Sequence, residues 1–169
     1  MGFGTTLWQE LASGFPGDVE TARIAVRLLA AIVLGGVVGL QRAHVGKVAG
    51  MRTHILVAMG AAMVAMLPHL TAMSTADASR IIQGTLTGIG FIGGGVILKM
   101  SEEHQIVGIT TAASIWLTAT VGIATGIGRL GLAVVGTVLA YLTLSFFGWL
   151  EGELFGKREP PQNPPNGGH

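Results

Sequence analysis

Long apolar stretches alternate with short polar segments from residue 18 to residue 150. Each stretch has about the 20 residues that a helix needs to cross the hydrocarbon of a bilayer. We therefore expect five transmembrane helices, at about 18–41, 53–70, 81–98, 109–127 and 130–150. Only Gly128 and Arg129 separate the last two stretches, which predicts an antiparallel pair of helices.

The third stretch is rich in glycine. Eighteen residues without a formal charge lie between Arg80 and Lys99, and six of them are glycine. An interior glycine costs a helix about 1 kcal/mol relative to alanine in water. In lipid the backbone has no other partner, so the segment stays helical and its smooth surface packs closely against neighbours. We expect the other helices to close around this one, along a face that begins with Gly84 and Gly88.

Composition supports a membrane protein. Half of the 169 residues are hydrophobic and only 11% are charged, whereas soluble domains carry about 25% charged residues. The mean hydropathy is +0.62. The expected class is an all-α polytopic membrane protein. The chain has no cysteine, which excludes a disulfide framework and a thiol site.

The expected domain organisation has three parts. Residues 1–17 form an interfacial segment anchored by Trp8, with a frayed terminus as the alternative. Residues 18–150 form the five-helix membrane domain. Residues 151–169 form a disordered cytoplasmic tail, because they are charged and then rich in proline and glycine. We expect no cleavable signal peptide, because residues 1–17 contain no basic residue.

The basic residues that flank the spans predict the orientation, because cytoplasmic segments carry the excess of lysine and arginine. An outside amino terminus and a cytoplasmic carboxyl terminus place six such residues inside and three outside. The inner ones are Arg42, Lys47, Arg52, Lys99, Lys157 and Arg158, and the outer ones are Arg23, Arg80 and Arg129.

The acidic residues bear on transport. All nine lie in termini, loops or helix ends, and none lies near the middle of a predicted span, where ion pumps normally place one. A transported cation would depend on a neutral polar path through Gln83, Thr87, Thr111 and Thr118. His54 and His69 lie at opposite ends of one predicted helix, so we expect interfacial histidines and no metal site.

Catalysis is not expected. No set of nucleophile, base and orienting residue is evident in the sequence. Gly88-x-Gly90-x-x-Gly93 matches the letters of the dinucleotide fingerprint. That fingerprint also requires a preceding strand and an acid about twenty residues later, and both are missing. We therefore expect neither an enzyme nor a cofactor.

Two basic features have alternative interpretations. Arg27 either extends to the outer headgroups or pairs with Glu20 or Asp77. The segment from Arg42 to Arg52 either fixes topology beside anionic lipid or docks onto Glu102 or Glu103 across the inner face. The second interpretation predicts that a charge swap of Arg42 and Glu102 restores function lost in each single variant.

Three blocks resemble the MgtC/SapB family: GLQRAHVGKVAGMRTHILVAMGAAM (39–63), RIIQGTLTGIGFIGGGVILK (80–99) and VGITTAASIWLTATVGIATGIG (107–128). The resemblance implies a bacterial inner-membrane protein linked to growth under magnesium limitation and to survival inside hosts. The matching family positions are Gly39, Arg42, Gly50, Arg52, Thr53, Arg80, Gly88, Gly90, Phe91, Gly93, Gly95, Thr111, Ala112, Ala113 and Trp116.

The chain departs from the family pattern. Many members have an acid before the arginine that Arg42 matches, where this chain has Gln41. Many also have a soluble domain after the last helix, which we do not expect here. The resemblance implies a non-enzymatic regulator that contacts other membrane proteins or itself, and a small magnesium transporter or channel is the alternative. The expected partners are the bilayer and membrane proteins, and not nucleic acid.

Overall fold

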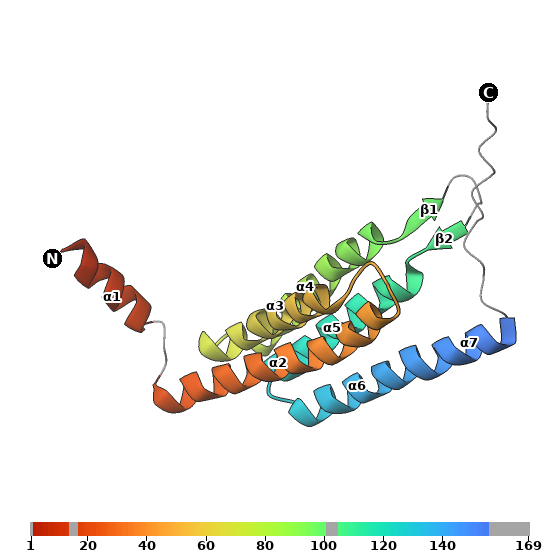
Figure 1. Cartoon of the computed structure of the whole chain (residues 1–169). Helices are drawn as coiled ribbons and strands as arrows, with labels where there is room; N and C mark the ends of the chain where they lie inside the picture. The colour runs from red at the N-terminus through yellow and green to blue at the C-terminus, as the bar shows by residue number, and fades with distance from the viewer. Residues whose placement is uncertain (1, 14–16, 101–104, 156–169) are drawn as a thin grey trace.

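The computed structural model describes residues 2–13, 17–100 and 105–155. Helices α2 to α7 run beside one another as a bundle (Figure 1). The elements in chain order are α1 (Phe3–Ser13), α2 (Asp18–His44), α3 (Met51–Leu70), α4 (Thr75–Gly95), β1 (Leu98–Met100), β2 (Gln105–Val107), α5 (Ile109–Gly126), α6 (Leu130–Leu142), the π-helical segment η1 (Thr143–Phe147) and α7 (Gly148–Phe155).

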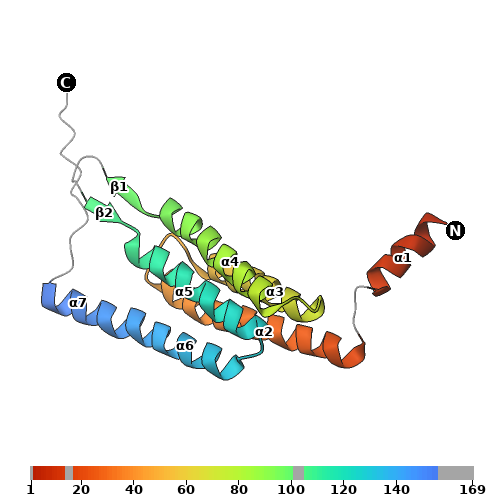
Figure 2. The ribbon, with the colours of Figure 1, turned by 180° about the vertical axis from the view of Figure 1, so that it is seen from behind.

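The class is confirmed: the chain is an all-α polytopic membrane protein. Among the described residues, four helices are long and apolar enough to cross a membrane: Asp18–His44, Met51–Leu70, Ile109–Gly126 and Leu130–Leu154. Helix α4 is not among those four, although it lies alongside α3 and α5 (Figure 2). The count of five spans and the orientation therefore stay predictions.

Helix α5 lies at the centre of the bundle. Eleven of its eighteen residues are buried, whereas the only buried residue of α4 is Gly93. The expectation that other helices close around the glycine helix is therefore wrong. The reason is that α5 combines buried side chains, such as Ile115 and Ala119, with two glycines at which α3 approaches its backbone.

Close packing of α3 on α5 depends on Gly122 and Gly126. A Cβ atom at Gly122 would overlap the carbonyl oxygen of Ala58, and one at Gly126 would overlap that of Ala62. Helix α2 approaches α3 in the same way, because a Cβ at Gly39 would lie 2.6 Å from the Cα atom of Met51. Glycine therefore brings three helices together, but on α2 and α5 and not on α4.

The glycine-rich segment does not remain helical to residue 98. Helix α4 begins at Thr75, where the Ser74 hydroxyl accepts a hydrogen bond from the Asp77 N–H at 3.2 Å, and ends at Gly95. The expected loop after it contains a short antiparallel hairpin, with Lys99 opposite Ile106. Three consecutive glycines weaken the helix, and the β-branched residues that follow favour extended backbone.

The last helix continues beyond the predicted boundary at residue 150, because α7 ends at Phe155. The predicted tail from residue 156 onward lies outside the described residues. The segment η1 interrupts the α-helical pattern, and Gln41 Nε2 donates a hydrogen bond to its Leu144 carbonyl oxygen at 3.1 Å. A π-helical turn leaves carbonyl groups poorly paired, and this side chain from α2 satisfies one of them.

The amino-terminal segment forms α1 over Phe3–Ser13, and the choice between an interfacial helix and a frayed terminus is not tested. Leu7 and Trp8 are exposed in it. Their exposure fits an interfacial helix, and the location at an interface stays a prediction.

Candidate functional site: a buried arginine and histidine between three helices

Arg42 is buried at the end of α2. Its side chain is 3% exposed, and its Nη2 donates a hydrogen bond to Thr111 Oγ1 at 3.1 Å, in the first turn of α5. Arg52, ten residues later, is exposed. A position for both arginines beside anionic lipid is therefore wrong for Arg42. Docking of Arg42 or Arg52 on Glu102 or Glu103 is not tested, because those acids lie outside the described residues.

His54 lies next to this arginine in the first turn of α3. It is fully buried, with its Nδ1 2.9 Å from the Gly50 carbonyl oxygen and its Nε2 3.2 Å from Ser114 Oγ. The Gly50 carbonyl oxygen only accepts, so we assign the ring proton to Nδ1. The Ser114 hydroxyl, which lies beside Nε2, donates its own proton to the Thr111 carbonyl oxygen at 2.8 Å. The expectation of an interfacial residue is wrong for His54, although His69 is exposed.

The buried set formed by Arg42, His54, Thr111 and Ser114 is called the Arg42–His54 cluster below. It joins the end of α2 to the first turns of α3 and α5. A buried charged donor costs several kcal/mol unless it is well paired. Among the described residues, the Arg42 Nε is buried without a hydrogen-bond partner. The cluster is therefore a cationic, donor-rich interior whose arrangement depends on each remaining hydrogen bond.

The predicted polar path does not form. Thr111 and Thr118 are buried in the bundle, whereas Gln83 and Thr87 are exposed on α4. The hydroxyl groups of Thr118 and Thr87 donate to carbonyl oxygens of their own helices, those of Ser114 and Gln83, at 2.8 and 2.9 Å. The four residues thus line no common passage within the described chain.

The glycine face of α4 is also open. Side chains on the other face of this helix, those of Ile82, Leu86 and Ile89, pack against α3 and α5. A Cβ atom at Gly93 would make an ordinary contact with Ala112, at 3.6 Å from its Cβ. The remaining glycines of the helix have open space where a side chain would be: Gly84, Gly88, Gly90, Gly94 and Gly95.

No group of three or more histidine, aspartate or glutamate residues that could hold a metal ion is found in the part of the chain that the structure describes. The oxygen atom that accepts from Arg42 is the neutral hydroxyl oxygen of Thr111. A guanidinium beside neutral oxygens repels a divalent cation, so the donor set of the cluster does not fit magnesium.

In comparison with known proteins, residues 28–153 match the MgtC family. The chain belongs to the MgtC family. It is 42% identical over 135 residues to Protein SrpB of Synechococcus elongatus, a match that covers 73% of this chain and 74% of SrpB. It is 39% identical over 148 residues to the putative magnesium transporter YhiD of Escherichia coli, covering 81% and 66%.

A third MgtC family relative is Protein MgtC of Brucella abortus, 38% identical over 117 residues. That match covers 69% of this chain and 48% of the relative, so the chain spans about half the length of that protein. No solved structure matches the chain. The name of the Escherichia coli relative, a putative magnesium transporter, links the MgtC family to magnesium at the level of the family.

The structure brings some of the predicted family positions together. Gly39, Arg42, Gly50 and Thr111 meet in or beside the Arg42–His54 cluster. Other predicted positions lie outside it, on exposed faces: Arg52, Arg80, Phe91, Ala113 and Trp116. Thr53 is half-buried in the first turn of α3.

Sequence reasoning named Gln41 only as a departure from the family pattern, without a partner, and it expected an interface for His54. A signal for His54 exists in the pattern, because it shares a helical face with Ala58, Ala61 and Ala65, all of which are buried. Gln41 carries no comparable signal, because its partner Leu144 is 103 positions away. The backbone oxygen of Leu144 is free to accept only because of the π-helical turn.

Proposed function

We propose that this chain is a non-enzymatic regulator of the bacterial inner membrane, which acts through contacts with another membrane protein or a second copy of itself. The observation that supports the proposal is the open glycine face of α4 beside a bundle that is otherwise closely packed. Small residues let helix backbones approach within van der Waals contact, which is how helices associate in lipid.

The charge of the interior supports the same proposal. In the described spans, the buried charged side chain is Arg42, and the polar groups around it are those of Thr111, Ser114 and His54. A cation that crosses the bundle there would lose its water and meet a positive charge. An interior of this kind suits a structural role for the cluster.

Magnesium transport is the second candidate, and the name of the Escherichia coli relative, a putative magnesium transporter, favours it. A transport pathway in this chain would have to use unwound backbone, because carbonyl oxygens can replace the hydration shell of an ion. The segment after α4, where Gly93, Gly94 and Gly95 precede a change to extended backbone, is the place where carbonyl groups could line such a path.

Site-specific photocross-linking in membranes tests the regulatory proposal. A photoreactive side chain at Phe91, exposed on α4 beside Gly88, should give adducts of defined mass, and one at Leu139, exposed on α6, should not. Gly88→Leu should remove the adducts without lowering the accumulation of the chain, because a side chain has open space there within the bundle. Equal labelling at both positions would contradict a specific interface.

A flux assay separates the two candidates. The purified chain in liposomes that contain a magnesium-sensitive dye should give no influx above that of empty liposomes under an imposed gradient. Influx that depends on the protein and that Gly94→Leu removes would overturn the regulatory proposal in favour of transport.

A further inference from the structure

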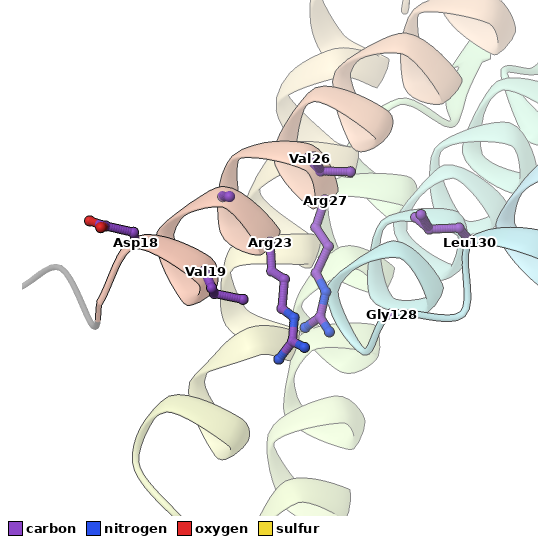
Figure 3. A pocket seen from close by; sticks show the side chains of 8 residues that line it. Asp18, Val19, Arg23, Val26, Arg27, Gly128 and Leu130 are labelled. Carbon is purple, nitrogen blue, oxygen red and sulfur yellow. The ribbon is translucent and has the colours of Figure 1, made fainter.

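Two adjoining hollows lie at the end of the bundle where α2 begins and α5 turns into α6. One is about 600 Å³ and is lined by the first turns of α2 and by Gly128 and Leu130. The other is about 340 Å³ and extends to His69 and Leu70 at the end of α3. Arg23 and Arg27 line both hollows, which adjoin at this pair of arginines, and Figure 3 shows the first hollow, called the pocket below.

Arg27 is held in place by the turn between α5 and α6. Its Nη1 donates a hydrogen bond to the Gly126 carbonyl oxygen at 2.9 Å. Its guanidinium lies against Gly128, where an added Cβ would be 2.8 Å from Nη2. Pairing with Glu20 or Asp77 does not describe this contact, because Arg27 caps the carboxyl end of α5, and those two carboxylates lie beside Arg23 and Arg80.

The cap fixes one edge of the guanidinium and leaves its other donors for a ligand. A guanidinium has five N–H donors, and the Gly126 carbonyl oxygen uses one of them. Positioning by the protein removes part of the entropy cost of binding. Arg27 is therefore a pre-oriented donor at the wall of the pocket.

Arg23 supplies the second guanidinium. It lies one turn before Arg27 on the same face of α2, and both side chains extend into the pocket in the same direction (Figure 3). Glu20 occupies one edge of Arg23 at 3.2 Å, and Asp18 points away from the two arginines. Two parallel guanidinium groups with free donors match the geometry of a phosphate group.

The remaining wall is apolar and includes Val19, Val26 and Leu130. It lies where the charged start of α2 meets its long apolar run, which is the depth at which headgroups meet hydrocarbon. A soluble phosphate has no apolar group that could contact this wall. A phospholipid places a phosphodiester and acyl chains side by side at that depth.

We propose that Arg23 and Arg27 bind the phosphodiester of an anionic phospholipid, whose glycerol and acyl chains lie along Val19, Val26 and Leu130. The ligand joins α2 to the turn after α5, and so it stabilises the contact that Arg27 makes with Gly126. This site is independent of the proposed regulatory face, which lies on α4.

Native mass spectrometry of the purified full chain, titrated with phosphatidylglycerol, tests the proposal. Arg23→Gln should weaken phosphatidylglycerol binding about tenfold, because one charge-assisted hydrogen-bonding group is lost. Arg23 caps no helix end within the bundle, so this variant should fold as the parent does. Arg129→Gln, which removes the same charge from a residue beside the pocket that does not line it, is the matched control and should bind normally.

Two further arms distinguish the sources of phosphate and the role of the turn. Phosphatidylcholine should bind at least about tenfold more weakly than phosphatidylglycerol, and inorganic phosphate should not compete. Gly128→Ala should weaken binding as well, because the new methyl group displaces the Arg27 guanidinium and the backbone φ of +83° is strained for alanine.

Three results would overturn the lipid site. An equal loss in Arg129→Gln would mean general attraction of charge. Competition by inorganic phosphate would mean a site for a soluble anion. Unchanged phosphatidylglycerol binding in the Arg23→Gln variant would remove the arginine pair from the ligand altogether.

Discussion

The hydrogen bond from Arg42 to Thr111 determines how much stability should be lost when Thr111 is substituted. Thr111→Val keeps the shape of the side chain and removes the oxygen that accepts from Nη2. A buried charged donor without its acceptor costs about 2 kcal/mol or more. We therefore expect Thr111→Val to lower the midpoint of thermal unfolding in detergent by several degrees.

The neighbouring residue provides the control for this prediction. Thr110 is exposed at the start of α5, so Thr110→Val should leave the midpoint within about a degree of the parent. Equal midpoints for the two variants would show that the guanidinium does not depend on this hydroxyl group.

The glycines of α5 and α4 should differ in how much a substitution lowers accumulation of the chain in membranes. We expect Gly122→Leu in α5 to abolish stable accumulation in membranes, because the side chain would overlap the Ala58 carbonyl group and separate α3 from α5. Gly88→Leu in α4 should accumulate normally within the same expression test. A severe loss for Gly88→Leu with tolerance of Gly122→Leu would reverse the assignment of the central helix.

The same contrast shows what the sequence could predict. Apolar length identified α2, α3, α5 and the last helix, because these spans follow from composition alone. It could not tell which glycines are in contact, since Gly88 and Gly122 have the same local signal and differ only in the helix opposite them. The end of α4 was missed because a glycine-rich run is compatible with either helix or extended backbone.

The site was partly predictable for a similar reason. Arg42 and Thr111 were named by their resemblance to family positions, but their mutual contact depends on a separation of 69 residues. The place of Arg42 in a basic segment suggested a surface residue. Burial came from the close approach of α2 to α3 at Gly39, which no periodicity in the sequence reveals.

The predicted topology of the whole molecule can be checked by labelling single cysteines. With five spans and an outside amino terminus, single cysteines at Ser13 and Thr75 should react with an impermeant reagent from outside. Cysteines at Lys47 and Pro161 should react only after the membrane is opened, because they lie beyond an odd number of crossings. The chain has no native cysteine, so each label reports one position.

A result in which positions 13 and 161 react from the same face would mean an even number of crossings. That outcome would place α4 within one leaflet or along the surface. Such a position would agree with the finding that α4 is not one of the four helices that are long and apolar enough to cross a membrane.

The contacts of Gly122 and Gly126 with α3 have a consequence for the rates at which parts of the molecule open. Two backbones that touch leave no side chain to rearrange first, so α3 and α5 separate only in a large cooperative step. Amide hydrogens in their facing turns should therefore exchange with solvent last, and with one common opening free energy. Helix α4, attached through one row of half-buried side chains, opens alone and first. Amide hydrogen exchange should thus be slow in α3 and α5 and fast in α4, within one bundle.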